Sequence, residues 1–308
     1  MAQTMQAIRY YQFGGPEVLQ LEEAPKPVPQ EGEVLIRIAA AGVLPVDWKI
    51  RKGLFPMPVK FPVTPGTAFA GVIESAGPGV TGLVAGQEVF GRSTNGTYSE
   101  YTTALEDSFA LKPSSISFAQ AATISGGATT AWSAINNAGI KAGDRVFIHG
   151  AGGGVGLFAV QFAKWKGANV IGTASPSNMD FIRSIGVDHA IDYTAGPFEA
   201  GLEREVDFML DTIGGVTLER SWQLIKPGGA LLTLTGQPPI ERGQQEGVRV
   251  LRSALASKQD LADIAELIGT GAVHAQVQAV FPLRETREAH IISEAGHGRG
   301  RIVLDMGK

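Results

Sequence analysis

One segment restricts the possible folds of this chain more than any other, the glycine-rich run His149-Gly-Ala-Gly-Gly-Gly-Val-Gly156. It follows a short apolar run, Arg145–His149, that is typical of a buried strand. It leads into a stretch from about 155 to 166 whose apolar residues have helical spacing. A strand, a glycine loop and a helix in this order form the context of a dinucleotide-binding fingerprint.

Glycines in such a loop let the backbone approach a pyrophosphate closely. The N-terminus of the following helix offers free N–H groups and the positive end of its dipole. Taken alone, a glycine cluster also fits a tight turn in which helix and strand pack closely. Because the flanking strands and helix are correctly placed, we expect a nucleotide site with contacts at Gly150, Gly153, Gly154, Val155 and Gly156.

The end of the next strand bears on the choice of cofactor. Sites that prefer NAD place an Asp or Glu there to hold the ribose 2′-OH. Here the segment from Gly172 to Asn178 contains no acid, and the first one is Asp180. We therefore expect NADP(H), with its 2′-phosphate near Ser175 and Asn178. NAD(H) stays an alternative, because no Lys or Arg is adjacent and the nearest cation is Arg183.

Strand-like and helical stretches alternate through the middle of the chain. The expected strands after the first are Asn169–Thr173, His189–Tyr193, Val206–Asp211 and Ala230–Thr235. The expected helices between them are Met179–Ile185 and Thr217–Leu224. Alternation of this kind indicates an α/β fold with a doubly wound parallel sheet.

The first third has a different pattern. Short apolar runs at Val34–Ala41, Ala70–Ser75 and Glu88–Gly91 are bounded by Gly or Pro, and frequent prolines interrupt any long helix. We expect a compact, irregular β-barrel there. The tail from Gln276 to Met306 mixes strand-like runs with a helix, and we expect it to return to this first domain.

Composition narrows the class of protein. A chain of 308 residues suggests two domains. Its net charge is −4 and it has no basic run, which argues against a nucleic-acid partner. It has no cysteine, which excludes disulfides, thiolate catalysis and cysteine-ligated zinc. No signal-like core or membrane-length apolar run occurs, so we expect a cytoplasmic protein without a membrane partner.

Several separated segments together resemble the zinc-independent quinone oxidoreductase branch of the medium-chain dehydrogenase/reductase superfamily. The resemblance covers essentially the whole chain. The segments are Ala40–Trp48, Pro65–Gly71, Gly96–Tyr101, Thr129–Trp132, Gly150–Gly156, Asp211–Gly215, Lys226–Gly229 and Gly296–Val303.

The resemblance implies a GroES-like β-barrel catalytic domain at residues 1–125, completed by residues 272–308. It implies a Rossmann dinucleotide-binding domain at residues 126–271, with the active site in the cleft. Its implied activity is NADPH-dependent reduction of quinones or α,β-unsaturated carbonyls. Relatives often form homodimers by joining Rossmann sheets edge to edge, for which Leu231–Leu234 and Val248–Leu251 are the candidate strands.

The resemblance also implies roles for residues at the cofactor. It places Thr130 near the nicotinamide, Tyr193 beside the adenosine end and Arg301 on the nicotinamide side. Each has a simpler alternative: Thr130 as a helix cap, Tyr193 as a core aromatic and Arg301 as a surface charge.

On the substrate side, the family-matched polar residue is Asp47, whose alternative role is turn formation after Pro45. The expected pocket residues are Leu44, Trp48 and Tyr98. Many quinone reductases have Asn at the position of Leu44 and Asp at the position of Ala68. Both changes make the pocket less polar, which weakens the case for a standard quinone as the substrate.

No metal site is expected. Zinc-dependent relatives place a cysteine within the segment that matches Gly42–Asp47, and a Gly-His-Glu motif where this chain has Gly66-Thr-Ala68. This chain has neither, and its five histidines show no ligand-like pairing.

Without a metal, conjugate reduction of an enone is easier to support than reduction of a simple carbonyl. Hydride adds to the β-carbon, and the negative charge spreads into an enolate that needs modest hydrogen bonding. Two other hypotheses stay open. One is another enzyme of this fold, a zinc-free alcohol dehydrogenase or an enoyl-thioester reductase. The other is an NADPH-binding redox sensor or structural protein without turnover.

Overall fold

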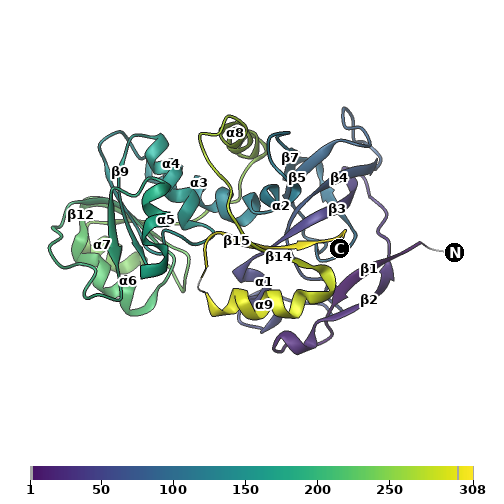
Figure 1. Ribbon diagram of the computed structural model, residues 1–308, viewed down its shortest axis with the longest axis horizontal. Helices are drawn as coiled ribbons and strands as arrows, with labels where there is room; N and C mark the ends of the chain where they lie inside the picture. The colour runs from purple at the N-terminus through teal and green to yellow at the C-terminus, as the bar shows by residue number, and fades with distance from the viewer. Residues whose placement is uncertain (1–2, 297, 308) are drawn as a thin grey trace. The chain divides into compact units, whose positions relative to one another are not determined.

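The computed structural model of the protein describes residues 3–296 and 298–307. The chain divides into two compact units, each built around its own sheet (Figure 1). Unit 1 comprises Met1–Gly126, Ser257–Thr270 and Ala275–Lys308, and unit 2 comprises Gly127–Ala256 and Gly271–His274. Among the described residues, no helix is both long enough and apolar enough to cross a membrane.

The main sheet of unit 1 has seven strands and is largely antiparallel. Six of them follow the order β14-β15-β3-β4-β5-β7, and β6 pairs separately with β3. Two further strands, β1 and β2, form an antiparallel ribbon. The bounds are β1 (Thr4–Arg9), β2 (Gln20–Pro25), β3 (Glu33–Val43), β4 (Ala68–Ala76), β5 (Glu88–Arg92), β6 (Tyr101–Leu105), β7 (Phe109–Leu111), β14 (Val277–Pro282) and β15 (Arg301–Asp305).

The long strand β3 organises this sheet, because it pairs with β4, with β6 and with the C-terminal strand β15. Most of its residues are buried, as expected for an apolar run rich in β-branched side chains. Val34, Ile36 and Ile38 enter the main core of the unit. Pairing of β15 with β3 means that the C-terminal tail completes the sheet.

The described residues of unit 1 also form four α-helices, α1 (Pro45–Arg51), α2 (Phe118–Ala121), α8 (Lys258–Gly269) and α9 (Thr286–Ala295). Helix α8 begins at a capping box in which Ser257 and Asp260 satisfy each other's backbone N–H groups. Its buried face carries Leu261, Ile264 and Ile268, and it packs against β7. The sequence-based boundary at residue 271 placed this helix in the second domain, whereas its packing groups it with unit 1.

The sheet of unit 2 has six strands, and every pair is parallel. The spatial order is β10-β9-β8-β11-β12-β13. Counted from β8 as the first, this is the order 3-2-1-4-5-6 of a doubly wound dinucleotide-binding sheet. The strands are β8 (Arg145–Ile148), β9 (Asn169–Ala174), β10 (His189–Asp192), β11 (Val206–Asp211), β12 (Ile225–Thr233) and β13 (Arg249–Leu251).

Five α-helices accompany this sheet (Figure 1). They are α3 (Thr129–Ala138), α4 (Gly156–Trp165), α5 (Met179–Ser184), α6 (Gly215–Ser221) and α7 (Ile240–Glu246). Residues Gly156–Ala163 of α4 are all buried, as expected for the central helix of such a fold. The sheet order confirms the predicted α/β fold class with a doubly wound parallel sheet.

Two differences from the expected elements concern strands β12 and β13 of this sheet. Strand β12 begins at Ile225, five residues earlier than expected. Its register against β11 shifts between Val206 and Phe208, where β12 carries the extra residues Lys226–Gly229. In addition, β12 lies inside the sheet, whereas β13 lies at its edge. Of the two proposed edge segments, only Val248–Leu251 therefore has an open side.

Candidate functional site

The glycine loop follows β8 and turns sharply before α4. Gly150 has a φ of +68°, and a Cβ there would lie 2.6 Å from Thr212 Oγ1. A Cβ on Gly156 would lie 2.1 Å from the carbonyl oxygen of Gly150. Both positions therefore require glycine for the backbone to pack this closely. These distances favour the close-packing role for Gly150 and Gly156, and their contact with a cofactor stays a prediction.

The centre of the loop is open. A Cβ on Gly153 would meet only the Gly150 carbonyl oxygen, at 3.3 Å. Within the described part of the chain, the amides of Gly154 and Val155 donate no hydrogen bond. They precede the ten-residue helix α4 and its positive dipole end. The Gly153 N–H donates to the Gly150 carbonyl oxygen at 3.0 Å, so the unused N–H groups are those of Gly154 and Val155. We call residues 153–155 the amide cradle, because two unused N–H groups beside open space are suited to bind an anion.

The segment after β9 lies beside this loop. A Cβ on Gly152 would approach Asn178 Nδ2 to 3.7 Å, which places the two segments in contact range. The hydroxyls of Ser175 and Ser177 are 3.2 Å apart and exposed. Arg183, the nearest expected cation, pairs with Asp180 at 3.1 Å. The structure thus brings Ser175 and Asn178 to the same edge of the sheet as the glycine loop.

Tyr193 belongs to the same edge. Its backbone N–H donates to the carbonyl oxygen of Ala174 at 3.4 Å, immediately before Ser175. Its side chain is 46% exposed, so it is not a core aromatic. Because its ring is exposed, it is accessible for contact with a nucleotide base.

A second ordered loop, not among the predicted site residues, adjoins the glycine loop at the end of β11. The buried Asp211 accepts hydrogen bonds from the amides of Ile213 (3.1 Å) and Gly214 (2.9 Å) and from Thr233 Oγ1 (2.7 Å). Thr212 Oγ1 donates to the His149 carbonyl oxygen at 2.8 Å. Since β8 and β11 flank the point where strand order reverses, both loops occupy the usual ligand-binding edge. The Asp-Thr-Ile-Gly-Gly motif was the available sequence signal.

Unit 1 contains a buried polar cluster around Asp47, which is 3% exposed. Its Oδ2 accepts hydrogen bonds from the Leu44 amide and from the Tyr98 hydroxyl, both at 2.8 Å. Burial raises the pKa of Asp47 to about 6, although these two hydrogen bonds and the charge of Arg301 oppose the rise. The bond to Leu44 closes the first turn of α1, so the turn-forming role is real. Both hydrogen bonds use Oδ2, and none to the other carboxylate oxygen of Asp47 occurs among the described residues.

Arg301 belongs to this cluster and is not a surface charge. It is buried, and burial lowers its pKa to about 10 against the favourable charges of Asp47 and Tyr98. Its Nη2 lies 3.5 Å from the Gly126 carbonyl oxygen, at the limit for a hydrogen bond. Its Nε has no hydrogen-bond partner among the described residues. A buried guanidinium N–H without a partner is suited to meet an oxygen of a ligand.

Helix α1, which carries Asp47, is held from its other end by Arg51. This fully buried side chain donates to the Gly14 carbonyl oxygen (3.1 Å) and to His290 Nδ1 (2.8 Å), and it pairs with Glu294. His290 and Glu294 belong to α9, which runs beside α1 (Figure 1). The position of Asp47 is therefore fixed by contacts on both sides of its helix.

The remaining predicted residues are placed as follows. Leu44 is buried, and its Cδ1 would lie 2.6 Å from a Cβ on Gly126. Trp48 is partly buried, and its indole N–H has no partner within the described residues. Thr130 is the second residue of α3, whose N-cap is Ala128, so Thr130 does not cap the helix.

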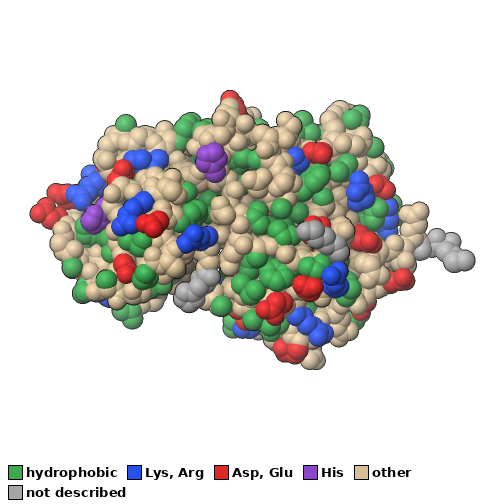
Figure 2. Space-filling model, in the orientation of Figure 1, with side chains coloured by type: hydrophobic (Ala, Val, Ile, Leu, Met, Phe, Trp, Pro, Cys, Tyr) green, Lys and Arg blue, Asp and Glu red, His purple; other side chains and the backbone are tan. Residues whose placement is uncertain are grey.

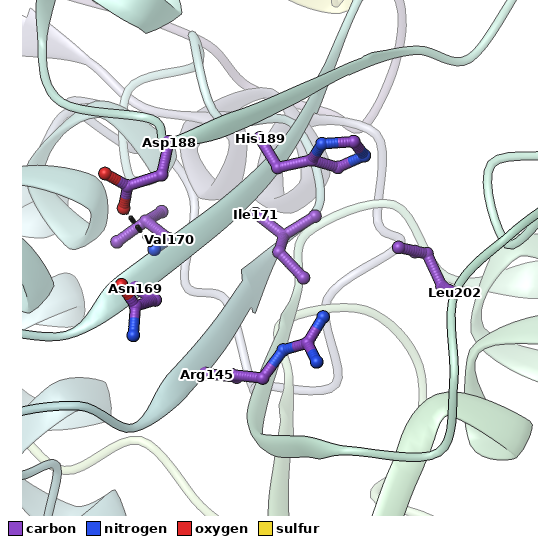
Figure 3. Close-up of a pocket in the computed structure, with 7 residues that line it drawn as sticks. All are labelled: Arg145, Asn169, Val170, Ile171, Asp188, His189 and Leu202. Atoms are coloured by element: carbon purple, nitrogen blue, oxygen red, sulfur yellow. Dashed lines mark hydrogen bonds between the residues drawn. The ribbon is translucent and has the colours of Figure 1, made fainter.

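The cavity in Figure 3 does not adjoin the glycine loop. Its volume is about 470 Å³, and Arg145, Asn169 and His189 around it begin strands β8, β9 and β10. It therefore lies at the opposite edge of the sheet from the glycine loop. Arg145 is already paired with Glu205, and Asp188 with Lys164. This cavity is not the expected nucleotide site.

No group of three or more His, Cys, Asp or Glu side chains suited to hold a metal occurs among the described residues, which include every histidine except His297. On the face shown in Figure 2, basic and acidic side chains are interspersed, without a large field of one sign.

Two family models match the chain. Residues 30–117 match the alcohol dehydrogenase GroES-like domain, and residues 185–304 match the family described as zinc-binding dehydrogenase. The quinone oxidoreductase of Sus scrofa is 32% identical over 321 residues, which cover 97% of each chain. The 2-methylene-furan-3-one reductase of Solanum lycopersicum is 36% identical over 245 residues, which cover 75% of this chain and 62% of the relative.

Solved structures of quinone oxidoreductases are also similar to this fold. The quinone oxidoreductase of Escherichia coli, solved in complex with NADPH, superposes with a TM-score of 0.89 at 30% identity. The match covers 97% of this chain and 99% of that one.

Proposed function

Because the chain belongs to the quinone oxidoreductases of the medium-chain dehydrogenase/reductase superfamily, we propose that it uses NADPH to reduce a quinone or an α,β-unsaturated carbonyl compound. Membership of this family by itself supports an NAD(P)H-dependent oxidoreductase that acts on a small molecule. The observation that supports the proposed use of NADPH is the amide cradle at residues 153–155. It follows strand β8 of a sheet that has the dinucleotide-binding strand order. The E. coli relative was solved with NADPH.

The residues of this chain fit that cofactor. We assign the pyrophosphate to Gly153, Gly154 and Val155, with Gly150 and Gly156 shaping the loop. The 2′-phosphate falls to Ser175 and Asn178, because no acid at the end of β9 repels it. Tyr193 contacts the adenosine end, and Thr130 and Arg301 serve the nicotinamide end. When bound, the nicotinamide supplies a hydride to the substrate.

Asp47 is the proposed proton donor. Hydride addition to the β-carbon of an enone leaves an enolate, whose charge must be stabilised and then quenched by a proton. A carboxyl group with a pKa of about 6 is partly protonated near neutral pH and can supply that proton. Tyr98 orients it through Oδ2, and the buried charge of Arg301 favours developing negative charge in the same cluster.

We propose that this chemistry needs no metal. The reason lies in the donor set: the chain has no cysteine, and Gly66-Thr-Ala68 replaces the Gly-His-Glu motif of zinc-dependent relatives. The proton of Asp47 and the charge of Arg301 then do part of the work of a Lewis acid.

Enones are favoured over quinones as the substrate. Leu44 and Ala68 are both buried and apolar, which leaves Asp47, Tyr98 and Arg301 as the polar groups of this cluster. A single hydrogen-bonding end beside apolar walls suits one carbonyl oxygen better than the two of a quinone. The tomato relative is named as a reductase of a methylene-furanone, which contains a conjugated ketone.

The test uses 4-deuterated NADPH with an alkenal, a methylene ketone, a quinone and an enoyl-CoA. We expect deuterium at the β-carbon of the reduced enone by mass spectrometry, and the highest kcat/KM for the enone or enal. An absence of NADPH oxidation with every acceptor would contradict enzymatic function and favour a sensor that binds NADPH without turnover.

A further inference from the structure

A buried histidine stands directly before the glycine loop, and neither the fold nor the proposed reaction accounts for it. His149 is 1% exposed and lies at the end of β8. Its ring packs against Phe147 and Phe198, with centroids 4.7 Å from each. An apolar side chain would fill this place without the cost of burying two polar nitrogens.

Both ring nitrogens have partners, and the partners fix the direction of every hydrogen bond. Ser221 Oγ donates to the Thr217 carbonyl oxygen at 2.7 Å, so its remaining role toward His149 Nε2, at 2.8 Å, is as acceptor. His149 therefore carries its proton on Nε2. Its Nδ1 is then an acceptor, and it receives the Thr173 hydroxyl proton at 3.2 Å.

The chain of bonds continues into the glycine loop. Thr173 Oγ1, having donated to His149, accepts from the Gly150 amide at 3.2 Å. Burial lowers the pKa of His149 to about 4, although the charges of Asp211 and Glu199 act in the opposite direction. The ring is therefore neutral near neutral pH, which this arrangement of donors and acceptors requires.

This series of hydrogen bonds connects three segments of unit 2. Gly150 begins the loop that carries the amide cradle. Thr173 lies on β9, two residues before Ser175, and Ser221 lies on α6, which follows the Asp211 loop. One ring thus ties the end of β8 to the end of β9 and to α6, directly behind the segments assigned to the two phosphate groups of the cofactor.

We propose that His149, acting through Thr173, is a positioning residue that sets the spacing between the amide cradle and the Ser175–Asn178 segment, and thereby the preference for NADPH over NADH. This inference rests on the proposed function. A loop held in register with both phosphate sites gains binding free energy from the pyrophosphate and the 2′-phosphate together. A loop free to shift loses part of the second contribution.

The test measures the dissociation constants of NADPH and NADH for the full chain. Thr173→Val removes the connecting hydroxyl and keeps the side-chain volume, and His149→Phe removes both ring nitrogens and keeps an aromatic ring. We expect the NADPH-to-NADH affinity ratio to fall roughly tenfold in Thr173→Val, which corresponds to about 1.4 kcal/mol. The double variant should show no further fall, since both changes break one link.

The matched control is Thr270→Val, which removes an exposed hydroxyl at the end of α8 in unit 1. It should leave the ratio unchanged. Thermal midpoints identify folded variants, and Thr173→Val carries the test if His149→Phe does not fold. An unchanged ratio in folded Thr173→Val overturns this inference alone. A wild-type protein without preference for NADPH overturns this inference together with the assignment of the 2′-phosphate to Ser175 and Asn178. A wild-type protein that binds neither nucleotide overturns the proposed function.

Discussion

At the scale of single residues, Asp47 is the side chain whose environment departs most from that of an ordinary carboxylate. It is buried, hydrogen-bonded through one oxygen only, and has a pKa of about 6. A group of this kind acts as a proton donor in its protonated form, which is lost as the pH rises through about 6. The pH dependence of turnover should therefore report on it.

For the proposed reaction, we expect kcat to fall as the pH rises above about 6, the pKa of Asp47. In Asp47→Asn we expect kcat to fall about 100-fold, the lower end of general acid catalysis, and to lose this dependence. Steady-state kinetics from pH 5 to 8.5 measure both. Asparagine can still accept from the Leu44 amide, so α1 keeps its cap. Full activity in Asp47→Asn would remove the residue from the mechanism.

Tyr98→Phe provides a second, directional prediction. The Tyr98 hydroxyl stabilises the charged form of Asp47 and so lowers its pKa. Without that hydrogen bond, the pKa should rise and the fall in kcat should move to higher pH, while the aromatic ring keeps its packing. A shift of the pH profile toward lower pH would show that the hydrogen bond acts differently from this account.

The sequence could identify the residues of the buried cluster around Asp47, but not that they lie close together in the fold. Leu44, Asp47, Tyr98 and Arg301 were each named as site residues, yet Asp47 and Arg301 lie more than 250 residues apart in the chain. Their proximity depends on the pairing of β15 with β3. The link from His149 to Thr173 and Ser221 was missed for the same reason, because three separate elements supply its members.

At the scale of elements, β13 is an edge strand of the unit 2 sheet and pairs only with β12 among the described strands. Open edges of this kind invite pairing with a second strand. We propose that two copies of the chain join there to form a homodimer, as the family resemblance implies.

This proposal predicts a dimer by size-exclusion chromatography with light scattering. Leu251→Pro should give a monomer, because proline disrupts strand pairing. Leu251→Ile keeps β-propensity and should stay dimeric. A wild-type monomer, or a Leu251→Pro dimer of unchanged dissociation constant, would contradict pairing through β13.

Strands β8 to β12 and helices α4, α5 and α6 of unit 2 were predictable from sequence, because short apolar runs alternate there with helical stretches. Helix α7 was not predicted, because Ile240 is its one apolar side chain. The start of β12 was missed, since Lys226-Pro-Gly-Gly229 reads as a turn and not as the interruption of a longer strand. Helix α8 lies before the predicted boundary at residue 271, yet it packs within unit 1. Its partner β7 lies about 150 residues earlier, a contact that local pattern does not encode.

At the scale of the whole molecule, buried titratable groups make stability depend on pH. Burial lowers the pKa of His149 to about 4 and that of His290 to about 3, from an ordinary value of 6.5. Each stabilises the fold above pH 6.5, and this contribution is lost as the pH falls toward the folded-state pKa. Asp47 acts oppositely, because its pKa is raised from 3.8 to about 6.

Two histidines outweigh one carboxyl, so we expect the free energy of unfolding to fall by a few kcal/mol between pH 6.5 and 4. Denaturant unfolding at several pH values measures this slope. His149→Phe should be less stable at pH 7 but show a shallower slope. An identical slope in that variant would mean that His149 already carries its charge in the folded state.

The central claim is that the amide cradle binds the pyrophosphate of NADPH, and titration calorimetry of the full chain tests it most directly. A Cβ on Gly153 projects into the open cradle, whereas a Cβ on Gly152 meets Ile182 and Phe181 at ordinary contact distances of 3.5 and 3.6 Å. We predict that the wild-type protein and Gly152→Ala bind NADPH with similar affinity and that Gly153→Ala binds at least roughly tenfold more weakly. Equal affinity in all three proteins, or no heat of binding with the wild type, would contradict the claim.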